Sequence, residues 1–167
     1  MNDRIEFRLA QLGIVLPVAP RPAGSYRPWV LSQGIVHLSG QTARVGGQIA
    51  YAGKVGGELT LEQGREAARI CAINLLSQLK AACAGRLERV ERCIRISGFV
   101  ASHPSFIRQP AVIDAASDLL IEVFGEAGRH ARSAIGVAVL PSDSAVEIEA
   151  LFAVTSEASP GCAPAAT

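Results

Sequence analysis

Residues 131–154 constrain the fold most strongly, because they hold two strand-like patterns separated by a short turn. In residues 134–140, branched apolar side chains alternate with alanine and glycine, and this period of two is typical of a β-strand. A Pro-Ser-Asp-Ser segment follows, with residue types that favour a turn. In residues 146–154, apolar side chains share one face, while Glu147 and Glu149 share the other. The simplest arrangement of the two strands is a hairpin.

Such a hairpin would bring Arg132, just ahead of the first strand, close to Glu147 at the start of the second. An arginine guanidinium can hold a carboxylate through two parallel hydrogen bonds. A glutamate can position or deprotonate a water molecule. Two interpretations stay open on these residues alone. One is a pocket for an organic anion, and the other is a surface hairpin with a solvated ion pair, which is common in proteins.

Two amphipathic helices are predicted in the middle of the chain. Thr60 and Gln63 form a capping box at the start of the first helix, and Gly85 ends it. The second helix has Pro110 in its first turn and ends at Gly125. Each helix carries an apolar stripe at helical spacing, which must be buried against another element. The stripes consist of Ala68, Cys71, Ala72, Leu75, Leu76 and Leu79 in the first helix, and of Val112, Ala116, Leu119, Leu120, Val123 and Phe124 in the second.

Further strands are predicted at residues 29–32, 35–40 and 89–100, and a short helix at residues 3–13. Strand pairs grouped around two helices indicate an α+β fold, with a single mixed β-sheet and both main helices on one face. The apolar residues of the other sheet face are too many to leave in water. We therefore expect a closed homo-oligomer that covers this face.

The chain has 167 residues, of which 49% are hydrophobic and 19% charged, so it can bury a core and is predicted to fold as a single domain. We assign residues 1–157 to this domain, with residues 1–20 as a helical extension and loop. Residues 158–167 are small and polar, and we expect them to form a disordered tail.

Composition also limits the partners and the compartment. The net charge is only +1 and no basic run is present, which argues against nucleic-acid binding. The sequence shows neither an apolar run that could span a bilayer nor a secretory signal, so we expect no membrane association and a cytoplasmic location. The four cysteines lack metal-ligand spacing, so no metal site is predicted.

Three segments carry a resemblance to a known family. From Arg132 the chain reads Arg-Ser-Ala-Ile-Gly-Val-Ala-Val-Leu-Pro, and from Val146 it reads Val-Glu-Ile-Glu-Ala. These segments resemble the C-terminal signature of the RidA/YjgF family, the reactive intermediate deaminases. Gly24-Ser25-Tyr26 resembles the family's Gly-Pro-Tyr, and Leu38-Ser39-Gly40-Gln41 resembles its strand-ending Ser-Gly-Gln. The resemblance extends over residues 20–155.

This resemblance implies a chorismate-mutase-like fold and a homotrimer, in which the sheets form an inner barrel and the active clefts lie between subunits. It implies hydrolysis of 2-aminoacrylate and related 2-imino acids to 2-keto acids and ammonia, with no cofactor. By the same resemblance, Arg132 would hold the substrate carboxylate and Glu147 would position the attacking water.

The substrate-binding set is implied in the same way. Backbone groups near Gly40 and Ala134 would bind the reacting end of the substrate, and Tyr26 would close the pocket from a neighbouring subunit. Phe99 matches an apolar position that lines the family's pocket, although ordinary core packing explains it equally well.

The chain departs from the family pattern at three positions. Ala134 stands where many relatives carry cysteine, Ser25 replaces a proline, and Ser117 stands near the place of an asparagine in the second helix. These departures indicate a divergent subgroup with an altered substrate. Two alternatives remain: a non-catalytic trimer that binds small carboxylates as a sensor or chaperone-like module, and a ribonuclease. The ribonuclease is disfavoured because the sequence shows no histidine pair and no basic groove.

Overall fold

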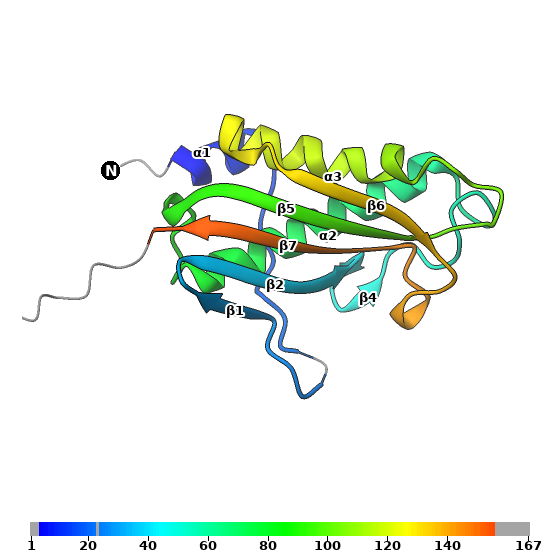
Figure 1. The fold of residues 1–167 in the computed structure, drawn as a ribbon, viewed down its shortest axis with the longest axis horizontal. Helices are drawn as coiled ribbons and strands as arrows, with labels where there is room; N and C mark the ends of the chain where they lie inside the picture. Colours follow the sequence, from blue (N-terminus) through cyan, green and yellow to red (C-terminus); the bar gives the residue numbers. More distant parts are fainter. Residues whose placement is uncertain (1–3, 23, 156–167) are drawn as a thin grey trace, which may run out of the picture.

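A computed structural model describes residues 4–22 and 24–155 of the chain. Its main element is a five-stranded mixed sheet in the order β1-β2-β7-β5-β6 (Figure 1). A two-stranded ribbon, β3-β4, stands beside it. The predicted tail at residues 158–167 lies outside the described residues. The strands are β1 (Trp29–Ser32), β2 (Ile35–Thr42), β3 (Arg44–Val45), β4 (Gln48–Ile49), β5 (Val90–Ala101), β6 (Ala131–Val137) and β7 (Val146–Val154).

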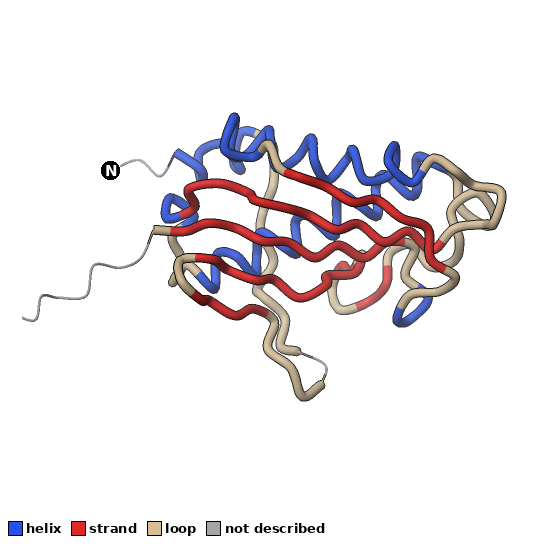
Figure 2. The backbone as a smooth tube through the Cα atoms, viewed as in Figure 1, coloured by secondary structure: helices blue, strands red, loops and turns tan. Residues whose placement is uncertain are grey.

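Two long helices, α2 (Leu61–Ala82) and α3 (Gln109–Phe124), cover one face of the sheet (Figure 2). This confirms the predicted α+β class. The capping box of α2 forms as expected. The backbone N–H of Gln63 donates to Thr60 Oγ1 at 3.2 Å, and the backbone N–H of Thr60 donates to Gln63 Oε1 at 2.8 Å. Short 3-10 turns occur at Leu87–Arg89, Gly125–Gly128 and Pro141–Asp143.

The predicted pairing of the last two strands is wrong. β6 pairs in parallel with β5, and β7 pairs antiparallel with both β5 and β2, so β5 separates β6 from β7. The cause is the α3 crossover. A strand, a helix and a second strand joined in this order pack back as a parallel unit, which leaves β6 at the sheet edge. β6 also starts earlier than predicted, at Ala131, and ends at Val137.

The core lies between the helices and the sheet and is mainly aliphatic. The α2 stripe is fully buried, as predicted, with Cys71, Leu75, Leu76 and Leu79 all inaccessible to solvent. Burying one such leucine contributes roughly 1.5–3 kcal/mol, so this stripe is sufficient to hold α2 on the sheet. From the sheet side, the core receives Ile96, Val100, Val146, Ile148 and Phe152.

The N-terminal helix α1 (Arg4–Gln11) completes the helical layer at the end of α3. Leu9 is buried in the core, and Arg8 Nη1 donates to the Val123 carbonyl at 3.0 Å. Glu6 forms an ion pair with Lys80 of α2 at 2.7 Å. The N-terminal helix therefore forms within the predicted range of residues 3–13 and packs against the other helices.

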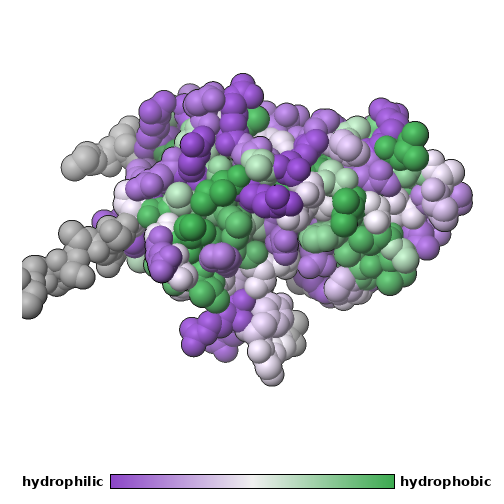
Figure 3. All heavy atoms as spheres, viewed as in Figure 1, coloured by the Kyte–Doolittle hydropathy of each residue, from purple (hydrophilic) through white to green (hydrophobic). Residues whose placement is uncertain are grey.

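In the described part of the chain, no helix covers the other face of the sheet. Figure 3 shows hydrophobic and hydrophilic side chains mixed over this face. Val30 and Ile135, both on this face by strand alternation, are about half exposed, at 48% and 50%. We call it the open face.

Candidate functional site

Arg132 lies on the helix-facing side of the edge strand β6. Its register partner on β5 is Ile96, whose side chain is buried under the helices. The guanidinium therefore reaches toward α3, where Nη1 binds Asp114 Oδ1 at 2.8 Å and donates to Ser117 Oγ at 3.1 Å. The Arg132 side chain is 24% exposed and that of Asp114 48% exposed, so this ion pair remains partly open to solvent.

His130 extends this hydrogen-bond network. Its Nδ1 lies 2.6 Å from the Gly128 carbonyl, which can only accept, so Nδ1 carries the proton of the neutral ring. Its Nε2 then accepts from the Ser117 hydroxyl at 3.1 Å. Burial lowers the pKa of His130, the Gly128 carbonyl opposes this shift, and the nearby Arg132 charge adds to it. His130 is therefore held neutral beside the Arg132–Asp114 pair.

Glu147 lies on the open face, at the opposite side of the sheet from Arg132. Its strand neighbours Val146 and Ile148 are fully buried, so alternation turns Glu147 away from the helices. The side chain is half-buried, and this desolvation raises the pKa of its carboxyl group, with a smaller contribution from Glu149. A carboxylate of this kind suits proton transfer, because its pKa is moved toward neutral pH.

Gly40 is required beside this carboxylate. It lies in β2 at an irregularity in the pairing with β7, between Leu38 and Gln41. A Cβ atom added to Gly40 would overlap Oε1 of Glu147 and lie 2.8 Å from its Cδ. The glycine therefore gives the carboxylate room against the strand. Phe99 is the register partner of Glu147 on β5 and is partly exposed on the same face.

Tyr26 shares a cavity of about 120 Å³ with Gly40 of the same chain. Tyr26 is 51% exposed, so nothing in the described residues covers it fully. The inner wall of the cavity contains two α2 amides that hold the backbone. Asn74 donates to the Thr42 and Arg44 carbonyls at 3.0 Å, and Gln78 donates to the Pro20 carbonyl at 2.9 Å.

The predicted residues thus fall into two groups. Gly40 and Glu147 are in contact, with Phe99 beside them and Tyr26 across the cavity. Arg132 and Ala134 lie together on the helix-facing side of β6. Neighbouring strands are about 4.8 Å apart, so β6 lies roughly 10 Å from β7 and Arg132 does not meet Glu147 within one chain.

Sequence reasoning did not identify Asp114 and His130. Asp114 precedes Ser117 by one helical turn, a spacing that places both on one side of α3. That spacing was a usable signal for Asp114. The role of His130 depends on the backbone around Gly128, which the sequence does not show.

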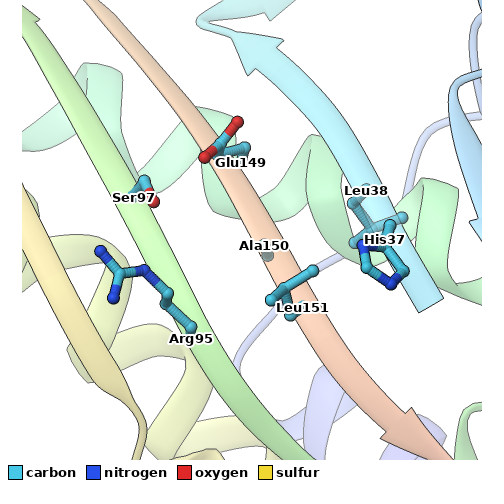
Figure 4. Close-up of a pocket in the computed structure, with 7 residues that line it drawn as sticks. All are labelled: His37, Leu38, Arg95, Ser97, Glu149, Ala150 and Leu151. Carbon is cyan, nitrogen blue, oxygen red and sulfur yellow. The ribbon is translucent and has the colours of Figure 1, made fainter. Parts of the chain in front are cut away.

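A second polar group lies on the open face, around a cavity of about 290 Å³ (Figure 4). Arg95 and Ser97 project from β5, Glu149 from β7 and His37 from β2. Arg95 Nη2 donates to Ser133 Oγ of β6 at 2.7 Å. None of the helices in residues 4–22 and 24–155 has the length and apolarity needed to span a bilayer.

Comparisons with known proteins agree with this architecture. Residues 6–154 match the family model described as "YjgF/chorismate_mutase-like, putative endoribonuclease". Protein TCP17 of Trypanosoma cruzi is 47% identical over 153 residues, which cover 90% of this chain and 94% of that protein. The crystal structure of Atu1372 from Agrobacterium tumefaciens is 44% identical with a TM-score of 0.87, covering 92% of this chain and 94% of that one.

A more distant structure shares the fold. E. coli TdcF, solved with bound serine, is 24% identical with a TM-score of 0.58, over 83% of this chain and 94% of that one. The match of the family model over most of the chain, together with the relatives above 40% identity, decides the assignment. This chain belongs to the YjgF/chorismate-mutase-like family.

Proposed function

We propose that the protein hydrolyses reactive enamines and imines, namely 2-aminoacrylate and related 2-imino acids, to 2-keto acids and ammonia. The observation that carries the proposal is the Glu147 carboxylate. It is half-buried, its pKa is raised, and it lies against a glycine that has room for no larger side chain. Family membership and the Arg132 guanidinium support the same chemistry.

The reaction needs only water and proton transfers. An enamine first takes a proton from solvent at its terminal carbon and becomes an iminium ion. Glu147 takes a proton from water while the water oxygen bonds to the iminium carbon, which leaves a carbinolamine. The protonated Glu147 gives this proton to the nitrogen, the C–N bond breaks, and ammonia leaves. The remaining hydroxyl proton passes to the carboxylate as the keto group forms. In this scheme Arg132 holds the substrate carboxylate, and backbone groups at Gly40 and Ala134 orient the reacting end.

In this proposal the complete site forms between copies of the chain in a homotrimer. Arg132 and Glu147 lie on opposite faces of the sheet and on strands that β5 separates, so one ligand cannot reach both in a single chain. β6 is an edge strand, and the open face exposes Val30 and Ile135. Association of copies would cover this face and bring Arg132 of one copy toward Gly40 and Glu147 of the next.

A second candidate is a non-catalytic module that binds small carboxylates. The serine in the E. coli TdcF crystal favours it, because a related fold holds a small amino acid there. Ribonuclease activity is less favoured. The chain has only three histidines and a net charge of +1, and the three lie apart in the chain, with His37 in β2 and His103 and His130 in two different loops.

The direct test generates 2-iminopropanoate in the assay and measures pyruvate and ammonia against the uncatalysed rate. We expect acceleration by the wild type, and we expect Arg132→Ala to abolish it while the oligomer stays intact. An absence of acceleration, with pyruvate still bound, would favour the binding module. RNA cleavage that survives Arg132→Ala would point to a contaminating nuclease.

The shared site has its own test. Chains carrying Arg132→Ala and chains carrying Glu147→Gln are refolded together in equal amounts. If each site takes its arginine and its glutamate from different copies, about one quarter of the sites in a random mixture contain both residues. We therefore expect the rate to recover to about a quarter of the wild-type rate. A mixture as inactive as its two components would refute the shared site.

A further inference from the structure

We propose that Asp114 makes the Arg132 site selective for acids with a cationic nitrogen next to the carboxylate, and selective against their keto acid products. The inference rests on the proposed function, because it takes Arg132 as the group that holds the substrate carboxylate. It adds a specificity residue and a ligand class to that site: small zwitterionic α-amino or α-iminium acids.

The argument begins with the geometry of the ion pair. Nη1 of Arg132 donates a hydrogen bond to Asp114 Oδ1 at 2.8 Å and another to Ser117 Oγ at 3.1 Å. Within residues 4–22 and 24–155, both hydrogen bonds of this guanidinium use Nη1, and the side chain is 24% exposed. The proposal therefore assigns Nε and Nη2 to the ligand carboxylate. Since Asp114 is 48% exposed, its carboxylate is accessible to the same ligand.

The position of Asp114 differs from that of the other acids on α3. Asp118 pairs with Arg65 at 3.8 Å, and Glu122 pairs with Arg69 at 3.6 Å, so both face arginines of α2. Asp114 instead pairs with an arginine of β6. The neighbouring His130 is neutral and makes its contact through Ser117, so it adds no positive charge that would cancel that of Asp114.

The charges of the pair complement a zwitterion. A plain carboxylate meets a guanidinium that is already neutralised, and it is repelled by Asp114 at short range. An acid with an adjacent cationic nitrogen places its carboxylate on Arg132 and its nitrogen on Asp114, so that both charges are matched. Hydrolysis removes this nitrogen as ammonia. The keto acid then loses one contact and gains a repulsion, which favours its release.

The test compares L-alanine with pyruvate, which share a carbon skeleton and a carboxylate and differ in the nitrogen. L-alanine serves as a stable analogue of the iminium acid. Their dissociation constants are measured by NMR titration of the full-length protein at pH 7, for the wild type, Asp114→Asn and Asp114→Ala. Asp118→Asn is the matched control, because it makes the same change at another arginine-paired aspartate of α3. Thermal unfolding of each variant checks that the fold is retained.

We expect the wild type to bind L-alanine more tightly than pyruvate. In Asp114→Asn and Asp114→Ala, the dissociation constant for L-alanine should rise about tenfold and that for pyruvate should fall, since a charge-assisted hydrogen bond is lost and a repulsion removed. Asp118→Asn should leave both constants unchanged. An alanine-to-pyruvate ratio that is the same in the wild type and both Asp114 variants would overturn the inference.

Arg132→Ala separates this inference from the proposed function. If Arg132→Ala abolishes binding of both ligands, but the ratio of the L-alanine and pyruvate dissociation constants is the same with and without Asp114, only the selectivity role fails. If Arg132→Ala changes neither dissociation constant, or if the wild type binds neither ligand, the Arg132 site itself fails and the selectivity role falls with it.

Discussion

Replacing Gly40 with alanine should disable catalysis without unfolding the protein. The backbone of Gly40 lies outside the left-handed region, so alanine fits its conformation. The new Cβ would lie 2.8 Å from Cδ of Glu147, whereas carbon atoms pack best at about 3.5–4.0 Å. The flexible carboxylate must therefore retreat by roughly 1 Å. A displacement of this size can lower the rate by about 100-fold.

The assay measures kcat/KM for release of ammonia from 2-iminopropanoate, together with thermal unfolding. Gly57→Ala is the matched control, because its backbone is also outside the left-handed region and its nearest neighbouring atom is 3.5 Å from the added Cβ. We expect Gly57→Ala to keep wild-type activity. A folded Gly40→Ala protein with near-wild-type kcat/KM would refute the role given to the Gly40–Glu147 contact.

Three further substitutions test the site. Glu147→Gln should lower turnover by about 10²–10⁴-fold with little change in pyruvate affinity, and equal rates would make Glu147 structural. Because the pKa of Glu147 is raised in the folded protein, its charged form destabilises the fold at pH 7. Glu147→Gln should therefore raise the free energy of unfolding at pH 7. This gain should vanish as the pH falls through the raised pKa toward 4.5. The pKa of His130 is lowered in the folded protein, so the free energy of unfolding should fall as the pH drops below 6.5. Measured by urea unfolding, this dependence on pH should be weaker in His130→Gln than in the wild type. The same dependence in both proteins would contradict a buried neutral ring. Arg132→Lys keeps the charge but loses the guanidinium fork, so substrate KM should rise; wild-type KM would argue against bidentate binding.

Much of the fold was predictable because its signals are local. The capping box at Thr60 and Gln63, and the left-handed glycines that follow both long helices, involve residues close together in the chain. The α2 stripe follows from helical periodicity alone. The family resemblance assigned Glu147 and Gly40 to one site, and the structure adds that a Cβ at Gly40 would overlap the Glu147 carboxylate.

Strand pairing is where the sequence was insufficient. Alternation tells which side chains share a face within one strand, so it separates Glu147 from Ile148, but it does not relate the faces of two strands. That relation depends on which strands pair and in what register. β6 and β7 both alternate and are joined by a short turn, so a hairpin was the natural prediction, and only the parallel β5–β6 pairing places Arg132 on the helix side.

The α3 crossover between β5 and β6 was the available signal, because such a connection favours a parallel pair. Once that pairing is recognised, Arg132 must face α3 and Glu147 must face away from it. The same pairing that separates these two residues within a chain is therefore what makes assembly between chains necessary for the proposed chemistry.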